Sequence, residues 1–164
     1  MSDAASSGES RQYLTFTLAE EQYAVDVDDV KEVLELTTVT RVPRTQEYMR
    51  GVINLRGSVV PVIDLRLKFG MEATEKTIDT SIVVLEVKLG GSTVTVGALA
   101  DSVQEVINLD ESVIEPPPRI GTRINTDFIR GIGKQDERFI IVLDIDRVFS
   151  EDEISTVVEE TANA

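Results

Sequence analysis

Two aspartates at matching places in the sequence are the first candidates for acid–base chemistry. Asp64 and Asp144 each end an apolar run and each precede a short amphipathic segment, 65–69 and 145–149. A pair of carboxylates can act as general acid and general base. The same placement is typical of a helix N-cap, whose carboxylate accepts hydrogen bonds from backbone N–H groups of the first turn. We favour the capping interpretation, because it explains the same residue at the same place in both segments.

Two other motifs resemble catalytic or phosphate-binding sites. An aspartic-protease dyad needs two Asp-Thr/Ser-Gly turns, and the segments 79–81 and 101–103 begin with Asp-Thr and Asp-Ser but lack the glycine. The Gly-Ile-Gly at 131–133 is too short to cradle a phosphate. A close approach of two backbone segments or a β-bulge is the better interpretation of these glycines.

The composition excludes several further classes of chemistry. The 164 residues include no Cys and no His, which excludes thiol catalysis, imidazole catalysis, a phosphoaccepting histidine and metal sites built on these ligands. A net charge of −14 disfavours binding to phosphate backbones. No apolar run is long enough to span a membrane, and no signal peptide opens the chain. We therefore expect a cytoplasmic protein with no cofactor, no metal, no nucleic-acid partner and no direct membrane insertion.

A basic island interrupts this acidic chain. Residues 41–68 carry a net charge of +4, with only Glu47 and Asp64 opposing the cations. The cations are Arg41, Arg44, Arg50, Arg56, Arg66 and Lys68. Arg56 lies at a predicted hairpin tip, where a guanidinium suits bidentate binding of a carboxylate. That carboxylate is either internal, with Glu32 as the candidate, or part of a binding partner.

The elements that must position these residues are short strands. Apolar and polar residues alternate over 12–18, which predicts a half-buried strand. Four hairpins are predicted, with turns at 19–21, 56–58, 90–91 and 135–137. Many short strands at this spacing favour a barrel or a sandwich. We expect residues 1–11 to be a disordered tail and residues 151–164 to be an acidic segment, either a capped helix or a solvated tail.

An internal repeat organises the chain. With a shift of 80 residues, 50–52 matches 130–132 and 59–65 matches 139–145. With a shift of 73, 28–36 matches 101–109. We interpret these matches as two copies of one unit, near 12–79 and 80–150, each with about five strands. Because a unit of ~70 residues is marginally stable alone, the two copies should pack together and leave a seam or groove between them.

The repeated Asp-x-Val-x-Glu-Val motif is a candidate lining for that seam. It occurs at 28–33 as Asp-Asp-Val-Lys-Glu-Val and at 101–106 as Asp-Ser-Val-Gln-Glu-Val. Such apolar side chains most often belong to a core. Because the motif is duplicated at the edge of each unit, it can instead line an apolar groove rimmed by charge, which is how an amphipathic partner helix is held.

Residues 51–66 (GVINLRGSVVPVIDLR) resemble the CheW family of chemotaxis coupling proteins, whose module also forms the regulatory domain of the CheA histidine kinase. The resemblance covers about 12–150 and includes 23–27, 30–33, Gly97 with Asp101, and 131–133. Ala24 departs from the glycine that the family often has there. The resemblance implies an all-β fold of two packed SH3-like five-stranded β-barrels from an internal duplication, with short helices.

The resemblance also implies a function. It implies a non-enzymatic adaptor that links the hairpin tips of methyl-accepting chemoreceptors, held between the barrels, to the CheA regulatory domain, held at the barrel ends, in arrays at the inner face of the membrane. Carried over by motif, the partner-binding residues are Val30, Glu32, Val33, Gly51, Arg56, Val103 and Val106. Two alternatives stay open: a CheW-like scaffold of a non-motility receptor–kinase pathway, and an acid–base hydrolase that uses Asp64, Asp101 or Asp144.

Overall fold

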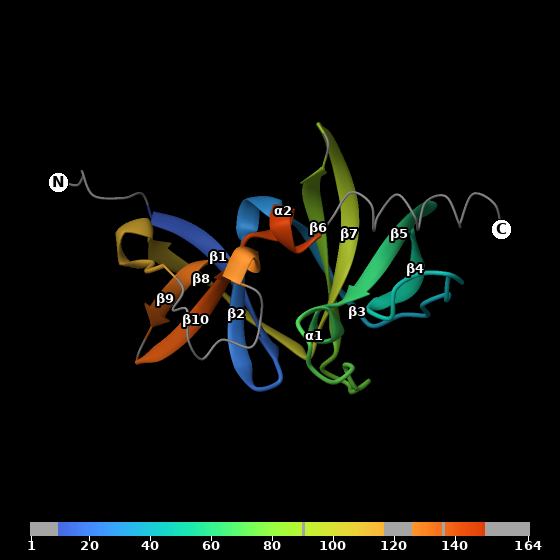
Figure 1. The fold of residues 1–164 in the computed structure, drawn as a ribbon, viewed down its shortest axis with the longest axis horizontal. Helices are drawn as coiled ribbons and strands as arrows, with labels where there is room; N and C mark the ends of the chain where they lie inside the picture. The colour runs from blue at the N-terminus through green and yellow to red at the C-terminus, as the bar shows by residue number, and fades with distance from the viewer. Residues whose placement is uncertain (1–9, 90, 117–125, 136, 150–164) are drawn as a thin grey trace.

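Ten strands make up most of the chain that the structure describes. The structure is a computed structural model, and it describes residues 10–89, 91–116, 126–135 and 137–149 (Figure 1). The strands are β1 (Ser10–Leu18), β2 (Glu21–Asp26), β3 (Val30–Glu35), β4 (Met49–Leu55), β5 (Ser58–Asp64), β6 (Ser81–Leu89), β7 (Ser92–Ala100), β8 (Ser102–Asp110), β9 (Ile129–Gln135) and β10 (Arg138–Leu143). The helical turns are η1 (Val27–Asp29), α1 (Leu65–Lys68), η2 (Glu111–Val113), η3 (Thr126–Phe128) and α2 (Ile145–Val148).

The four predicted hairpins are confirmed. They are β1–β2, β4–β5, β6–β7 and β9–β10, and in each of them two residues join the strands. Two-residue loops of this kind need positive φ, which matches the twist of the flanking strands. Arg56 and Gly57 have φ values of 50° and 87°, and Ala19 and Glu20 have 50° and 71°. A local turn preference therefore sets the register of each hairpin.

The strands form two five-stranded sheets with the same internal order. One sheet has the order β8-β1-β2-β10-β9 and the other has β3-β6-β7-β5-β4. The repeat makes β1 to β5 equivalent to β6 to β10, so the two orders are identical strand for strand. A backbone bridge between Thr40 and Val52 closes the second sheet, and one between Glu115 and Ile132 closes the first. We name them the terminal barrel (β1, β2, β8, β9, β10) and the central barrel (β3 to β7).

The structure corrects the expected boundary between residues 79 and 80. The hairpin β1–β2 of the first repeat joins β8, β9 and β10, while β6–β7 of the second repeat joins β3, β4 and β5. In the terminal barrel β8 pairs with β1 and runs parallel to β2. In the central barrel β3 pairs with β6 and runs parallel to β7. A parallel connection within one sheet needs a dozen or more residues. Only Val27–Asp29 separate β2 from β3, and only Asp101 separates β7 from β8, so the chain passes to the other barrel at both places.

Three apolar cores hold the barrels. One lies inside the terminal barrel and one inside the central barrel, and the largest lies between the two and takes residues from both. This shared core contains Phe16, Tyr23, Ile63, Val83 and Phe149. Each fully buried side chain of this size stabilises the fold by about 1.5–3 kcal/mol. The expected seam is therefore filled, and a cavity within it measures only about 10 Å³.

The two short α-helices lie at the middle of the molecule, between the barrels (Figure 1). Each contributes to the shared core, α1 through Leu65 and α2 through Ile145 and Val148. Within the described ranges, no helix is both long enough and apolar enough to cross a membrane.

The expected disordered tail, 1–11, is partly wrong. Ser10 and Arg11 belong to β1 and pair with β8. Arg11 also forms ion pairs with Asp26 and Glu111, each at 3.0 Å, and these contacts explain why the strand begins earlier than the apolar alternation. Residues 1–9 and the acidic segment 151–164 lie outside the described residues.

Candidate partner-binding surface

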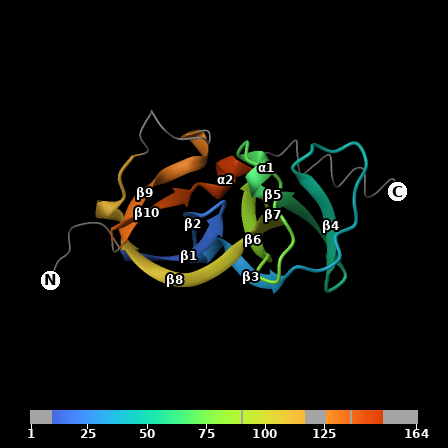
Figure 2. The same ribbon diagram turned by 90° about the horizontal axis from the view of Figure 1, so that it is seen from below.

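Two equivalent edge strands carry most of the predicted binding residues. Each of β3 and β8 pairs on one side only, with β6 and β1 respectively. Both run along the same side of the molecule (Figure 2). The tertiary structure therefore brings the two copies of the Asp-x-Val-x-Glu-Val motif to one face, although they are far apart in the sequence.

Val33 and Val106 are the exposed members of this set. Their side chains are 42% and 50% exposed. Val33 lies opposite Val83 and Val106 lies opposite Leu14, and both of these partners are buried in the shared core. Directly opposite residues of neighbouring strands share a face. The two valines therefore extend the shared core to the surface, one from each barrel.

Val30 and Val103 have a different environment. Both are partly buried and pack against the shared core. They lie at the starts of β3 and β8, directly after the links that carry the chain from one barrel to the other. Their first role is to anchor these links, and only part of each side chain remains available to a partner.

Arg56 binds an internal carboxylate. Its Nη1 and Nη2 atoms lie 2.6 Å and 2.9 Å from the two carboxylate oxygens of Glu32. The hydrogen bond from Arg56 lowers the pKa of Glu32 below 4.5 and correspondingly raises the pKa of Arg56. The internal alternative for the carboxylate is thus confirmed.

The turn positions this guanidinium at the barrel end. The backbone N–H of Gly57 donates to Asn54 Oδ1 at 2.8 Å, which fixes the β4–β5 turn. The Arg56 side chain is 71% exposed, against 22% for Glu32. In the second repeat the position equivalent to Arg56 is Asp136 in the sequence, so an arginine at this turn position occurs in the first repeat and not in the second. The pairing of Glu with Arg therefore distinguishes one barrel from the other.

Gly51 is buried, and its part in the fold is structural. Its φ is +145°, and a Cβ atom there would lie 2.1 Å from the backbone oxygen of Thr40. Thr40 is the residue that closes the central barrel against Val52. The equivalent Gly131 would meet Glu115 O at 2.8 Å in the same way. Close approach of two backbone segments is thus the role of both glycines. For Gly131 the sequence indicated this or a β-bulge, and the β9–β10 ladder also shifts its register beside Gly131.

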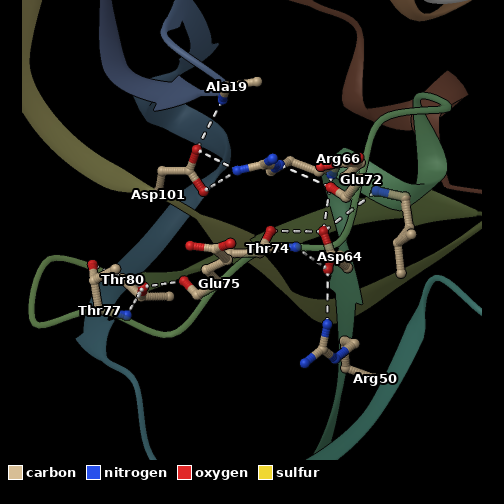
Figure 3. A network of polar contacts seen from close by, with 11 residues as sticks. Ala19, Arg50, Asp64, Arg66, Glu72, Thr74, Glu75, Thr77, Thr80 and Asp101 are labelled. Atoms are coloured by element: carbon tan, nitrogen blue, oxygen red, sulfur yellow. Dashed lines mark hydrogen bonds and ion pairs between the residues drawn. The ribbon is translucent and has the colours of Figure 1, made fainter.

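Asp64 is a fully buried carboxylate with several donors around it (Figure 3). It accepts from the backbone N–H of Arg66 at 3.0 Å and from that of Leu67 at 3.4 Å, which confirms the predicted N-cap of α1. It also accepts from the N–H and hydroxyl of Thr74, at 2.9 Å and 2.8 Å, and from Arg50 at 3.0 Å. With both oxygens engaged and no surface exposed, the side chain acts as a structural acceptor.

Asp144 does not repeat this arrangement. It occupies the N-cap position of α2, but its side chain makes no capping hydrogen bond. Its carboxylate instead lies 3.6 Å from Arg147, in a partly exposed pair. The predicted side-chain cap is therefore wrong at this second position. Thr74, which gives Asp64 two hydrogen bonds, lies in the loop 69–80 of the first repeat, and Arg130, the equivalent of Arg50, pairs with Glu111 instead.

A polar contact that the sequence did not predict joins the two barrels. Arg66 Nη1 lies 3.1 Å from Asp101 Oδ2, and the same Oδ2 accepts from the backbone N–H of Ala19 at 2.8 Å (Figure 3). Arg66 also donates to Glu72 O at 2.9 Å. The contact connects α1 of the central barrel to the β1–β2 turn of the terminal barrel. Arg66 was visible in the basic island, but its partner becomes its neighbour only through the packing of the barrels.

Each barrel also has a cleft at its hairpin end. The parallel strands β5 and β7 pair only over three residues each, and β10 and β2 only over two. Where they diverge, they leave clefts of about 380 Å³ and 360 Å³. Arg56 and Val59 line the first cleft, and Gln22 and Arg138 line the second. No group of three or more metal-ligating side chains occurs within the described ranges.

This geometry matches that of known proteins. A family model for the CheW-like domain matches residues 12–153. The chain belongs to the CheW-like domain family. The chemotaxis protein CheW of Klebsiella aerogenes is 35% identical over 147 residues, which cover 90% of this chain and 86% of that protein. The CheW of Bacillus subtilis is 34% identical over 150 residues, which cover 91% and 93%.

A solved CheW structure has the same architecture. The scaffolding protein TtCheW from Thermoanaerobacter tengcongensis superposes with a TM-score of 0.78 at 37% identity, and the match covers 93% of this chain and 96% of that one. The CheW-like fold of two packed β-barrels, inferred from the block around Asn54 to Gly57, is thus confirmed. The comparisons place this chain among chemotaxis and scaffold proteins.

Proposed function

We propose that this chain is a non-enzymatic adaptor that couples the cytoplasmic tips of chemoreceptors to a CheA histidine kinase. The observation that carries the proposal is the pair of equivalent valines, Val33 and Val106, which extend the shared core to the surface from two barrels. An exposed apolar side chain on each of the two edge strands suits the apolar face of a receptor helix. Binding to receptors would place the protein in the cytoplasm at the receptor arrays.

The second contact uses the barrel ends. The clefts beside Arg56 and Arg138 expose strand edges and charged side chains at corresponding ends of the two barrels. A regulatory domain built of similar barrels can meet such ends with matching shapes. A receptor site at the seam and kinase sites at the ends allow both partners to bind at once, which adds avidity to two moderate contacts.

The two alternative functions differ from this proposal, one in its partners and the other in its chemistry. A CheW-like scaffold of a non-motility pathway would use the same surfaces with other receptors. A hydrolase needs carboxylates open to substrate, whereas Asp64 is fully buried and Asp101 is engaged by Arg66 and Ala19. The geometry therefore favours binding over acid–base chemistry.

The test measures receptor and kinase binding separately on one set of variants. Val33→Asp and Val106→Asp should each weaken binding of a receptor tip fragment by about tenfold or more and spare binding of the CheA regulatory domain. Arg138→Glu should weaken kinase binding and spare the receptor fragment. Ile78→Asp, at a side chain that is 98% exposed in a loop, is the matched control and should change neither. Proportional loss of both partners in every variant would mean one shared site and would end the bridging proposal.

Arg56 needs a charge-swap design, because it already binds Glu32. Arg56→Glu should remain folded and lose coupling, since the pair is exposed and a partner carboxylate would meet a like charge. The double variant Glu32→Arg with Arg56→Glu restores the internal pair with reversed polarity. If the double variant regains binding, the internal ion pair itself is what binding requires, and a direct contact of Arg56 with the partner is refuted.

A further inference from the structure

The basic island divides into paired and unpaired cations. Four of its six members are engaged: Arg50, Arg56 and Arg66 form ion pairs, and Lys68 lies 4.4 Å from the centre of the Tyr48 ring. Arg41 and Arg44 make no ion pair or hydrogen bond with any residue that the structure describes. The coupling surface uses neither of them, so the island is not fully explained by the proposed function.

Arg41 borders a small cavity on the central barrel. The cavity has a volume of about 170 Å³. Three cations line it: Arg41 from the segment between β3 and β4, Arg50 from β4, and Lys76 from the loop between α1 and β6. Leu36, Val39 and Leu99 form its apolar wall, and among the residues that the structure describes no carboxylate lines it. In a chain of net charge −14, three cations around a cavity without an acidic lining are a specific arrangement.

The walls of this cavity are held in place. Thr74 is fixed by its two hydrogen bonds to Asp64, and the Thr80 hydroxyl donates to Glu75 O at 3.0 Å and accepts from Thr77 N at 2.9 Å (Figure 3). On the other side, the backbone bridge between Thr40 and Val52 holds the segment that carries Arg41. A site with fixed walls loses little conformational freedom when a ligand binds.

Arg50 is oriented by its buried partner. One of its terminal nitrogens donates to Asp64 at 3.0 Å. A guanidinium has five N–H donors in a planar fork, so this single bond leaves donors for a second acceptor. Asp64 thereby positions Arg50 at the cavity while Arg41 and Lys76 supply the uncompensated charge.

We infer that this cavity binds a carboxylate on a short aliphatic stem, with the carboxylate at Arg41, Arg50 and Lys76 and the stem against Leu36, Val39 and Leu99. Its volume is below the roughly 300–1,000 Å³ of sites for drug-sized ligands, so a side-chain-sized group fits better than a nucleotide. Two sources carry this chemistry: an acidic side chain presented by a partner protein, and a free dicarboxylic acid. The inference stands independently of the coupling function.

The test uses the full chain and glutarate as the probe. Glutarate should shift the NMR signal of Arg50 Nε–H and the amide signals around residues 36–41 and 74–80 in a saturable way, with a dissociation constant on the order of millimolar. Lys76→Glu should weaken this binding at least tenfold, and Lys76→Gln should weaken it by less. Arg44→Glu is the matched control, because it makes the same charge change at a residue that does not line the cavity, in the segment between β3 and β4 that also carries Arg41, and it should change the affinity less than twofold.

The outcomes separate the inference from general charge attraction. No saturable shift, or an equal loss with Arg44→Glu, would overturn it. Inorganic phosphate should bind more weakly, because it has no stem, and equal or tighter binding of phosphate would overturn the assignment of the apolar wall.

A short capped peptide with a single Glu, compared with its Gln twin, identifies the source. Binding of the Glu peptide at least as tight as that of glutarate supports a protein partner. Binding of glutarate alone supports a free dicarboxylic acid. Both measurements need neither receptor nor kinase, so their failure is distinguishable from failure of the coupling function.

Discussion

Replacing Asp64 by Ala tests whether the buried carboxylate stabilises the fold as the structure indicates. The change removes the N-cap of α1, which costs about 1 kcal/mol. It also leaves the buried N–H and hydroxyl of Thr74 without their acceptor, at about 1–3 kcal/mol for an unsatisfied buried group. The Arg50 side chain is 30% exposed, so water compensates much of its loss. The expected total is at least about 3 kcal/mol, or roughly 6 °C or more in Tm for a chain of this length.

Asp144→Ala is the matched control, because the repeat makes the two positions equivalent. Asp144 makes no capping hydrogen bond, and its pair with Arg147 at 3.6 Å is partly exposed. Its loss should stay within about 1 kcal/mol, or roughly 2–4 °C. Urea and thermal unfolding followed by circular dichroism measure both variants under the same conditions.

The energetic account requires that Asp64→Ala lose more stability than Asp144→Ala. Equal losses of stability would mean that the buried network around Asp64 contributes no more than an exposed aspartate at the same helix position. A large loss in Asp144→Ala would mean that its side chain caps α2 in solution. Either result would refute the energetic account of the network.

Three further predictions concern the backbone and pH. Gly51→Ala should lower the free energy of unfolding in urea by about 2 kcal/mol or more, because its Cβ would meet Thr40 O and its φ is +145°. Gly57→Ala has open space around the Cβ and should lower it by about 1 kcal/mol. Equal losses would contradict the steric account. The Glu32 pKa should lie below 4.5 in an NMR titration and rise toward that value in Arg56→Gln; the stabilisation it gives is present above 4.5 and is lost as pH falls through the lowered pKa. Burial and then neighbouring carboxylates raise the Asp29 pKa above 3.8, so the ionised side chain destabilises the fold at neutral pH. Asp29→Asn should therefore raise Tm at neutral pH by about 1–2 °C. A gain in Tm that persists when the pH falls well below 3.8 would exclude this cause.

The sequence by itself determined the hairpins and the duplication. Each two-residue turn and each alternating strand depends on residues that are neighbours in the chain, so local preference was enough to place them. The block around Arg56 was specific enough to indicate the family, and the hairpin tip made Glu32 a candidate partner before any geometry was known. The Asp64 cap followed in the same way from a residue and the turn that comes directly after it.

Only the tertiary structure decided which copy of the repeat supplies which strands. Both copies have nearly the same pattern, so β1–β2 is locally as compatible with β3 to β5 as with β8 to β10. The short links at Val27–Asp29 and Asp101 exclude the pairing of β1–β2 with β3 to β5. This exclusion follows only when the direction of each strand in the sheet is known. The same exchange brings β3 and β8, the strands that carry Val33 and Val106, to one side of the molecule and sets Arg66 against Asp101. These contacts join residues that are distant in the chain, and their energies depend on the packing of two barrels, which no local pattern encodes.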